Sequence, residues 1–118
     1  MSPGGARMRR VDVAIREVLG EAVSHDLKDP RVGFVTVTEV RTSSDLRHAR
    51  VYVSVFGTPE EQQATLDGLS SAHGLLQSRV ARELRLKRTP TLVFELDETA
   101  ARAARLEGLI DSTMEEPE

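Results

Sequence analysis

Five basic side chains lie close together between Leu75 and Pro90, where Glu83 is the single acidic residue. Clusters of arginine and lysine suit contact with phosphate groups, because one guanidinium can donate two parallel hydrogen bonds to a phosphate. Three of the arginines recur at every third position, a spacing that predicts a basic stripe along one face of a helix. The five residues are Arg79, Arg82, Arg85, Lys87 and Arg88. The expected chemistry is binding to a nucleic-acid backbone, and a solvated helix face is the alternative.

A second basic cluster near the N-terminus could extend the same contact. It contains Arg9 and Arg10, with Arg7 just before them. The chain has three phenylalanines, one tyrosine and no tryptophan, and none of them lies between residues 66 and 90. Base stacking on aromatic rings is therefore not expected in this region, and recognition of phosphates and shape fits better.

The helical pattern that carries the arginines is interrupted at Ala72, His73 and Gly74. Apolar residues keep helical spacing on both sides of this break, at Leu66, Leu69, Ala72, Leu76, Val80 and Leu84. The chain has no Gly-x-x-Gly sequence, the loop with which many KH domains bring a bare backbone close to nucleic-acid phosphates. A kink that serves packing alone is the alternative to a role in binding.

Catalytic and metal-binding patterns are weak. The three histidines, His25, His48 and His73, fall in separate predicted elements and share no motif. His25 with Asp26, or His48, could be imagined as an acid–base group of a small ribonuclease, but isolated surface histidines are far more common. The chain has no cysteine, so thiolate metal sites and disulfides are excluded. We expect no catalytic residue, no metal, no cofactor and no small-molecule substrate.

The elements that position these residues can be predicted from periodicity. Helical spacing of apolar residues predicts an amphipathic helix over residues 9–27, and alternation predicts strands at 34–40, 49–55 and 91–96. Asp29-Pro30 with Gly33, and the turn around Asp45, are expected to be structural turns. Thr58-Pro59 with Glu61 has the pattern of a helix N-terminus, and the broken helix should run from there to about residue 86.

The element order is therefore α-β-β-α-break-α-β, which predicts an α+β sandwich with two helical layers over a three-stranded sheet. The first two strands should form an antiparallel hairpin. This order is similar to a type II KH-like module, in which the paired helices form the nucleic-acid platform. We expect a disordered N-terminus at 1–8, one domain at 9–97 and an acidic tail at 98–118. The alanine-rich start of the tail favours a short helix before a disordered end.

Charge is unevenly distributed along the chain. The net charge is −3, but residues 1–90 carry 14 Lys and Arg against 11 Asp and Glu, and residues 91–118 carry 2 against 8. The body is thus mildly basic behind an acidic tail, which is compatible with a nucleic-acid partner. The sequence contains no apolar stretch of bilayer-spanning length and no signal-peptide pattern at its N-terminus. We expect a monomer in the cytoplasm.

Several blocks together resemble the ribosome-binding factor A family, over roughly residues 8–112. The first blocks are residues 29–38 (DPRVGFVTVT), Ser44-Asp45-Leu46 and residues 49–53 (ARVYV). The later ones are Ala72-His73-Gly74 and residues 84–97, with LRLKRTP followed by Leu92, Phe94 and Asp97. The resemblance implies a KH-like fold in which an Ala-x-Gly kink, here Ala72 and Gly74, replaces the Gly-x-x-Gly loop.

The resemblance also implies a function. Members of this family bind the small (30S) ribosomal subunit during its late maturation, support 5′-end processing of precursor 16S rRNA and assist growth after cold shock. They are not enzymes. By resemblance, this chain would bind 16S rRNA near the decoding region of immature subunits. A protein-binding α+β adaptor, with its basic face turned to an acidic partner, is the alternative. Two features depart from the family pattern: the histidine inside the kink, and a body that is only mildly basic.

Overall fold

The computed structural model describes residues 5–99 and contains three helices and three strands. In chain order these are α1 (Gly5–His25), β1 (Val35–Thr42), β2 (His48–Val55), α2 (Pro59–Ser71), α3 (His73–Leu84) and β3 (Thr91–Leu96). The predicted order is confirmed. Residues 5–8, predicted to be disordered, form the start of α1 instead. The disorder predicted for residues 1–4 and the helix predicted in the tail lie outside the described residues.

The three strands form one mixed sheet with β2 at its centre. β1 pairs with β2 in antiparallel fashion, as predicted for a hairpin, and β3 pairs with β2 in parallel. The parallel pair requires a crossover, which α2 and α3 provide. The turn between β1 and β2 consequently lies at the same end of the sheet as the start of β3, where the N–H of Thr91 donates to the carbonyl of Arg47.

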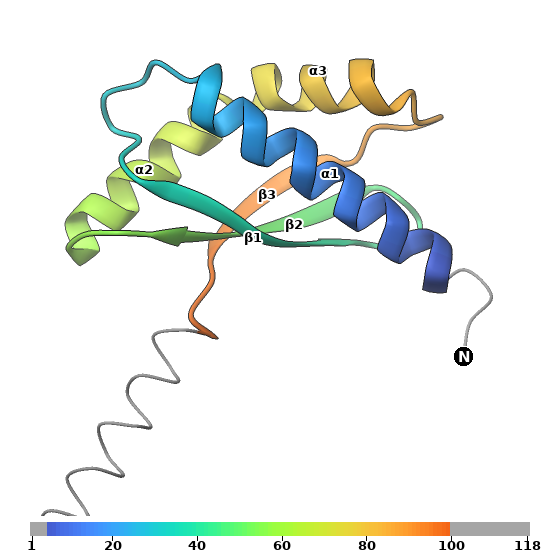
Figure 1. The fold of residues 1–118 in the computed structure, drawn as a ribbon, viewed down its shortest axis with the longest axis horizontal. Helices are drawn as coiled ribbons and strands as arrows, with labels where there is room; N and C mark the ends of the chain where they lie inside the picture. The colour runs from blue at the N-terminus through green and yellow to red at the C-terminus, as the bar shows by residue number, and fades with distance from the viewer. Residues whose placement is uncertain (1–4, 100–118) are drawn as a thin grey trace, which may run out of the picture.

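All three helices cover the same face of the sheet, so the structure has one helical layer where two were predicted (Figure 1). Strand alternation explains this arrangement, because β2 buries every second side chain. The core lies between the helices and this face. It is formed by Ile15, Val18, Leu19, Ala22, Val23, Val37, Val40, Ala49, Val51, Val53, Val55, Leu69, Leu76, Val80 and Leu92. Among residues 5–99, no helix is both long and apolar enough to cross a lipid bilayer.

A bulge shifts the register of β1 between Val37 and Glu39. The hydroxyl of Thr38 lies 3.2 Å from the carbonyl oxygen of Tyr52 and 2.5 Å from Oδ2 of Asp97. The bulge therefore ties β1 to the residue that follows β3. The hydrogen bond from Thr38 lowers the pKa of Asp97, which keeps this carboxylate ionised at neutral pH.

Local signals fix the helix boundaries. The capping box predicted at α2 is present: the N–H of Glu61 donates to Oγ1 of Thr58 at 3.2 Å, and the Glu61 carboxylate accepts from the N–H of Thr58 at 2.9 Å. Pro59 occupies the first turn. α3 ends at Leu84, two residues before the predicted end, because Arg85 adopts a left-handed conformation.

Candidate nucleic-acid interface

The helix break lies where the sequence placed it. Ala72 is the C-cap residue of α2, and its N–H donates to the carbonyls of Gly68 and Leu69, both at 3.1 Å. Its own carbonyl accepts from the N–H of Leu76, so Ala72 also opens α3. No side chain caps the start of α3, because none of its first N–H groups donates a hydrogen bond to the side chain of a capping residue. The negative end of the α2 dipole and the positive end of the α3 dipole meet at the break, so their partial charges largely offset each other.

Gly74 has no packing reason to be glycine. A Cβ added there would meet no atom within 4 Å, and His73 and Gly74 are both exposed. The backbone at the break is thus accessible from outside, which is the property a close phosphate contact needs.

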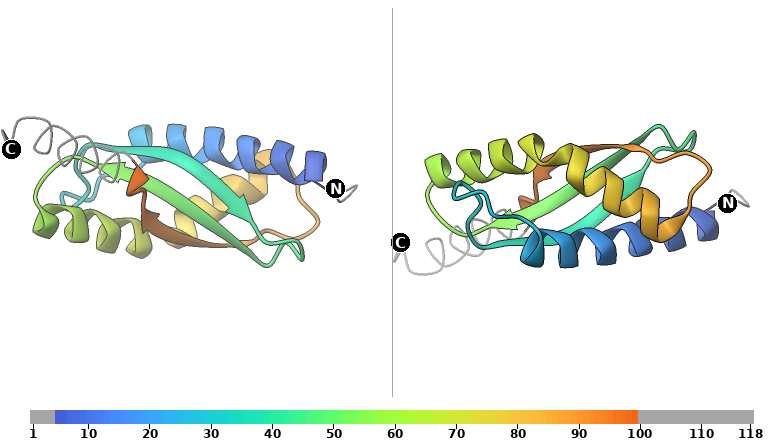
Figure 2. Two further views of the ribbon diagram at one scale, coloured as in Figure 1. Left: turned by 90° about the horizontal axis from the view of Figure 1, so that it is seen from below. Right: turned by 90° about the horizontal axis from the view of Figure 1, so that it is seen from above.

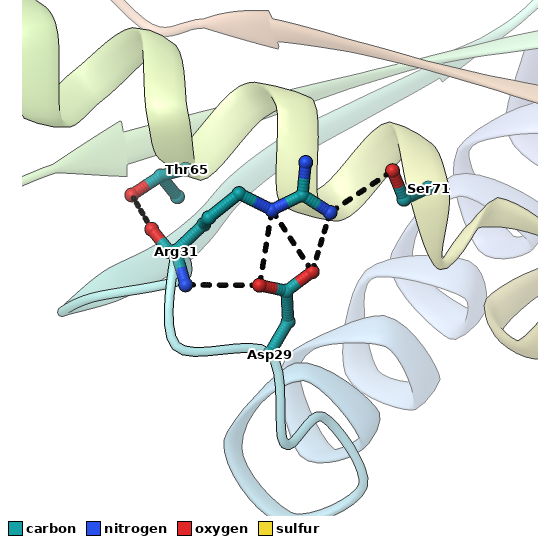
Figure 3. Close-up of polar contacts among 4 residues, drawn as sticks. All are labelled: Asp29, Arg31, Thr65 and Ser71. Carbon is teal, nitrogen blue, oxygen red and sulfur yellow. Dashed lines mark hydrogen bonds and ion pairs between the residues drawn. The ribbon is translucent and has the colours of Figure 1, made fainter.

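The loop between α1 and β1 holds the last turn of α2 (Figure 3). The N–H of Arg31 donates to Oδ1 of Asp29 at 2.9 Å, and Nη2 of Arg31 lies 2.6 Å from Oδ2 of the same carboxylate. The same Nη2 donates to Oγ of Ser71 at 3.1 Å, one residue before the break. Hydrogen bonds from Arg31 lower the pKa of Asp29 to about 2, so the pair stays charged well below neutral pH. The predicted turn is confirmed, and its link to the break is an addition.

Beside this turn, the backbone of α2 comes very close to the loop between α1 and β1. A Cβ on the buried Gly68 of α2 would lie 2.7 Å from Cγ2 of Val32. The buried Thr65, one turn earlier, donates to the carbonyl of Arg31 at 3.2 Å. Gly68 and Thr65 together hold the loop between α1 and β1 against α2.

Arg79 is not a free side chain on the predicted basic stripe. Its Nη1 pairs with Oδ2 of Asp26, just after α1, and its Nη2 lies 2.8 Å from Oε1 of Glu83. Its side chain is 15% exposed. The guanidinium thus joins α1 to α3, and the prediction that Arg79, Arg82 and Arg85 share one exposed face is wrong.

We expect Arg79→Glu to lower the midpoint of thermal unfolding by about 5 °C or more. The substitution would place a third carboxylate beside Asp26 and Glu83. Arg82→Glu, on the exposed side of the same helix, should change the midpoint by no more than about 2 °C. Scanning calorimetry on both variants measures this difference. Equal midpoints would contradict the structural role of Arg79.

The remaining cations of the predicted cluster are exposed and unpaired. Within residues 5–99, their side chains form no ion pair or hydrogen bond with a described residue, whereas Arg31, Arg41, Arg47, Arg50 and Arg79 all form ion pairs. The unpaired set from α3 and the following loop is Arg82, Arg85, Lys87 and Arg88. These four cations are available to an external anion.

The turn after α3 is what separates these cations from the core. Arg85 adopts φ 49° and ψ 41°, and its N–H donates to the carbonyl of Ala81 at 3.1 Å. The left-handed turn lets Leu84 and Leu86 both pack against the core while Arg85 and Lys87 stay exposed. Glycine is the usual residue in this conformation, so an arginine here carries backbone strain.

Arg9 and Arg10 are exposed on the first turns of α1 and are likewise unpaired among the described residues. Asp12 anchors this part of α1, since its Oδ1 accepts from the N–H of Thr42 at 2.9 Å. Figure 2 shows the start of α1, the loop after α3 and the turn between β1 and β2 toward the same end of the molecule. We call Arg9, Arg10, Arg82, Arg85, Lys87 and Arg88 the basic end.

The break lies apart from the basic end. α3 has 12 residues, so the break and Arg85 are separated by about 18 Å of helix. The sequence pattern predicted one binding platform over residues 66–96, which includes the helix break and the basic residues after it. In the structure the break and the basic residues form two candidate contact regions, joined by α3. Residues 5–99 contain no cluster of three or more side chains suited to hold a metal ion.

Comparison with known proteins gives consistent results. A family model described as ribosome-binding factor A matches residues 7–110. A curated protein of Halorhodospira halophila named ribosome-binding factor A is 49% identical over 112 residues, which cover 94% of this chain and 89% of that protein.

Two sets of coordinates of the Thermus thermophilus factor have the same fold. The crystal structure of its ribosome-binding factor A matches with a TM-score of 0.68 and 31% identity, over 75% of this chain and 94% of that one. Coordinates of a homology model of the Thermus factor, fitted into the cryo-EM map of its complex with the 30S subunit, match with a TM-score of 0.58. They are 32% identical, over 83% of this chain and 96% of that one.

Proposed function

The chain belongs to the ribosome-binding factor A family, and on this premise we propose that it binds the immature 30S ribosomal subunit as a non-catalytic assembly factor. The complex of the Thermus relative with the 30S subunit supports this partner. The factor acts in the cytoplasm as a monomer. It supports late maturation of the subunit and 5′-end processing of precursor 16S rRNA. It also supports growth of the cell after cold shock. No catalytic step, metal or cofactor is needed.

The observation that carries the proposed mechanism is the separation of paired from unpaired cations. Five arginines of the described chain form ion pairs with carboxylates, whereas the six cations of the basic end do not. Arg7, Arg16 and Lys28 are also without an ion pair among the described residues, but they are not part of this cluster. Unpaired, exposed arginines and lysines neutralise phosphates and release condensed counterions, so they contribute directly to affinity. The basic end therefore docks on 16S rRNA near the decoding region, and Arg79 acts indirectly by fixing α3.

The fold has the type II KH-like arrangement over residues 9–97, with the acidic segment 98–118 outside it. In this arrangement the Ala72-His73-Gly74 break replaces the Gly-x-x-Gly loop. The exposed backbone at Gly74 supports a phosphate contact here. A short kink offers a smaller contact than an open loop. Recognition therefore rests on the shape of folded rRNA, read at two points along α3, rather than on the bases of a single strand.

Cells deprived of this protein provide the test of the maturation role. Primer extension on their rRNA should show 16S precursors with an unprocessed 5′ end, and the wild-type gene should restore the mature end. If a variant with the cations of the basic end replaced also restored the mature 5′ end, docking of the basic end on rRNA would not be needed for maturation. Normal processing in the deprived cells would contradict the proposed function.

Replacing Arg85 by glycine should separate stability from binding. Glycine adopts φ 49° without the steric cost that a side chain carries, so Arg85→Gly is expected to raise the free energy of unfolding by up to about 1 kcal/mol. The loss of one phosphate contact should reduce the slope of log affinity against log salt by about one unit. Urea unfolding and a salt series of binding to small subunits measure the two effects. An unchanged slope would remove Arg85 from the interface.

A further inference from the structure

Two phenylalanines are exposed at paired backbone positions, at the end of the sheet opposite the basic end. Phe34 is 87% exposed and Phe56 is 89% exposed, the highest values among the exposed large hydrophobic residues of the described chain. The N–H of Phe56 donates to the carbonyl of Phe34 at 3.2 Å, so the two residues continue the pairing of β1 with β2. Two large apolar side chains exposed at neighbouring positions mark an interaction surface more often than a single exposed one.

The backbone holds this pair in a fixed position. Gly57, next to Phe56, has φ +138°, and a Cβ there would lie 3.1 Å from the side chain of Glu61. The capping box of Thr58 and Glu61 fixes the turn that follows. The side-chain amide of Gln62 donates to the carbonyl of Val55 at 3.2 Å, which ties α2 to the end of β2. Because the turn is ordered without the help of either aromatic ring, the rings are displayed rather than required by the fold.

The surroundings of the pair are acidic. Glu60 and Glu61 are exposed in the first turn of α2, and the sequence has no lysine or arginine from Val51 to Ala72. On the Phe34 side, Arg31 is ion-paired with Asp29. Hydrogen bonds from Thr58 lower the pKa of Glu61, so its charge is present at neutral pH. Carboxylates beside aromatic rings favour a cation, which can bind the ring face and the carboxylate together.

We infer that Phe34 and Phe56 form a second docking surface, which binds a lysine- or arginine-bearing protein surface of the small ribosomal subunit. This inference rests on the proposed function for the location of the partner, and it adds a protein contact to the rRNA contact. The rRNA backbone fits poorly, because Glu60 and Glu61 repel phosphates. A second copy of this chain also fits poorly, since it would bring the same carboxylates face to face across the interface.

The test compares two double variants in binding to purified small subunits across a salt series. Phe34→Ser with Phe56→Ser should reduce the affinity on the order of 100-fold, because two aromatic side chains lose their burial. The salt slope should stay at the wild-type value, since no cation is removed. Val13→Ser with Val93→Ser removes two other exposed apolar side chains and should change the affinity less than about threefold.

A photo-crosslinking arm identifies the occupant. With p-benzoylphenylalanine at position 56 of the full chain, bound to the same subunits, we expect a crosslink to a lysine- or arginine-rich peptide of a ribosomal protein. A crosslink to rRNA or to a second copy of the chain would overturn the inference. The inference would also be overturned if the Phe34→Ser/Phe56→Ser variant bound small subunits with the affinity of the wild-type chain. In that case the proposed function would stand. If the wild-type chain binds no small subunits at any salt, the proposed function and this inference both fail.

Discussion

Reversing three charges of the basic end, with Arg82→Glu, Lys87→Glu and Arg88→Glu in one chain, is expected to weaken binding to small subunits on the order of 100-fold. Each side chain is exposed and unpaired among the described residues, so its charge is free to meet a phosphate. Three lost contacts should also lower the slope of log affinity against log salt by about three units. Fluorescence anisotropy with a labelled chain, repeated across a salt series, measures both quantities.

Lys28→Glu is the control for net charge. Lys28 is exposed in the loop between α1 and β1, away from the basic end (Figure 1). If long-range attraction alone holds the complex, each reversal should weaken binding equally wherever it lies. We expect a much smaller loss per reversed charge at Lys28. A triple variant with wild-type affinity and slope would show that the basic end does not contact rRNA.

The second large effect concerns two helical glycines that sequence alone does not distinguish. Gly68→Ala is expected to lower the free energy of unfolding by about 1–3 kcal/mol, because the added Cβ would lie 2.7 Å from Cγ2 of Val32. Val32 has little freedom to move, since Thr65 and the Asp29–Arg31 turn hold its loop on α2. Gly74→Ala meets no atom and should be neutral or stabilising by up to about 1 kcal/mol.

Urea denaturation separates the two glycine variants, and binding gives an independent measurement. Gly74→Ala should keep its stability and still bind small subunits more weakly, if a phosphate approaches the backbone at the break. Gly68→Ala should bind normally once folded, unless the shift of the loop moves the break. A Gly68→Ala protein as stable as wild type would mean that the contact between α2 and the loop at Val32 is not tightly packed.

Most of the fold could be predicted, because its signals are local. The apolar stripe of α1 is buried where periodicity placed it, including Ile15, Leu19 and Ala22. The Thr58–Glu61 capping box set the start of α2. The bulge at Thr38 could not be predicted, since it depends on Asp97, a partner 59 residues away. The single helical layer follows from which face of each strand is buried, and sequence patterns alone did not resolve it.

The arginine stripe shows where sequence reasoning failed on the candidate site. A spacing of three residues advances a helix by about 300°, so Arg79 and Arg85 would point about 120° apart even in an unbroken helix. That rotation turns Arg79 toward Asp26, beside the end of α1, and leaves Arg82 exposed. The presence of basic residues was read correctly, but their pairing depends on tertiary neighbours that the sequence does not reveal.

The exposure of Phe34 and Phe56 follows from strand alternation, although hydrophobicity alone would assign both side chains to the core. Phe34 precedes Val35 and Phe56 follows Val55, and both valines face the core. Alternation therefore places the two phenylalanines on the opposite face of the sheet. The sequence did not reveal that all three helices lie on the core side, so that no helix covers this face (Figure 1).

Sedimentation through a sucrose gradient tests the central claim most directly. The purified chain would be mixed with small subunits that carry precursor 16S rRNA, with large subunits, and with whole ribosomes, each in a separate gradient at moderate salt. The account predicts that the chain travels with the immature small subunits and leaves them as salt rises. A chain that stays at the top of every gradient, or travels equally with all three particles, would contradict it.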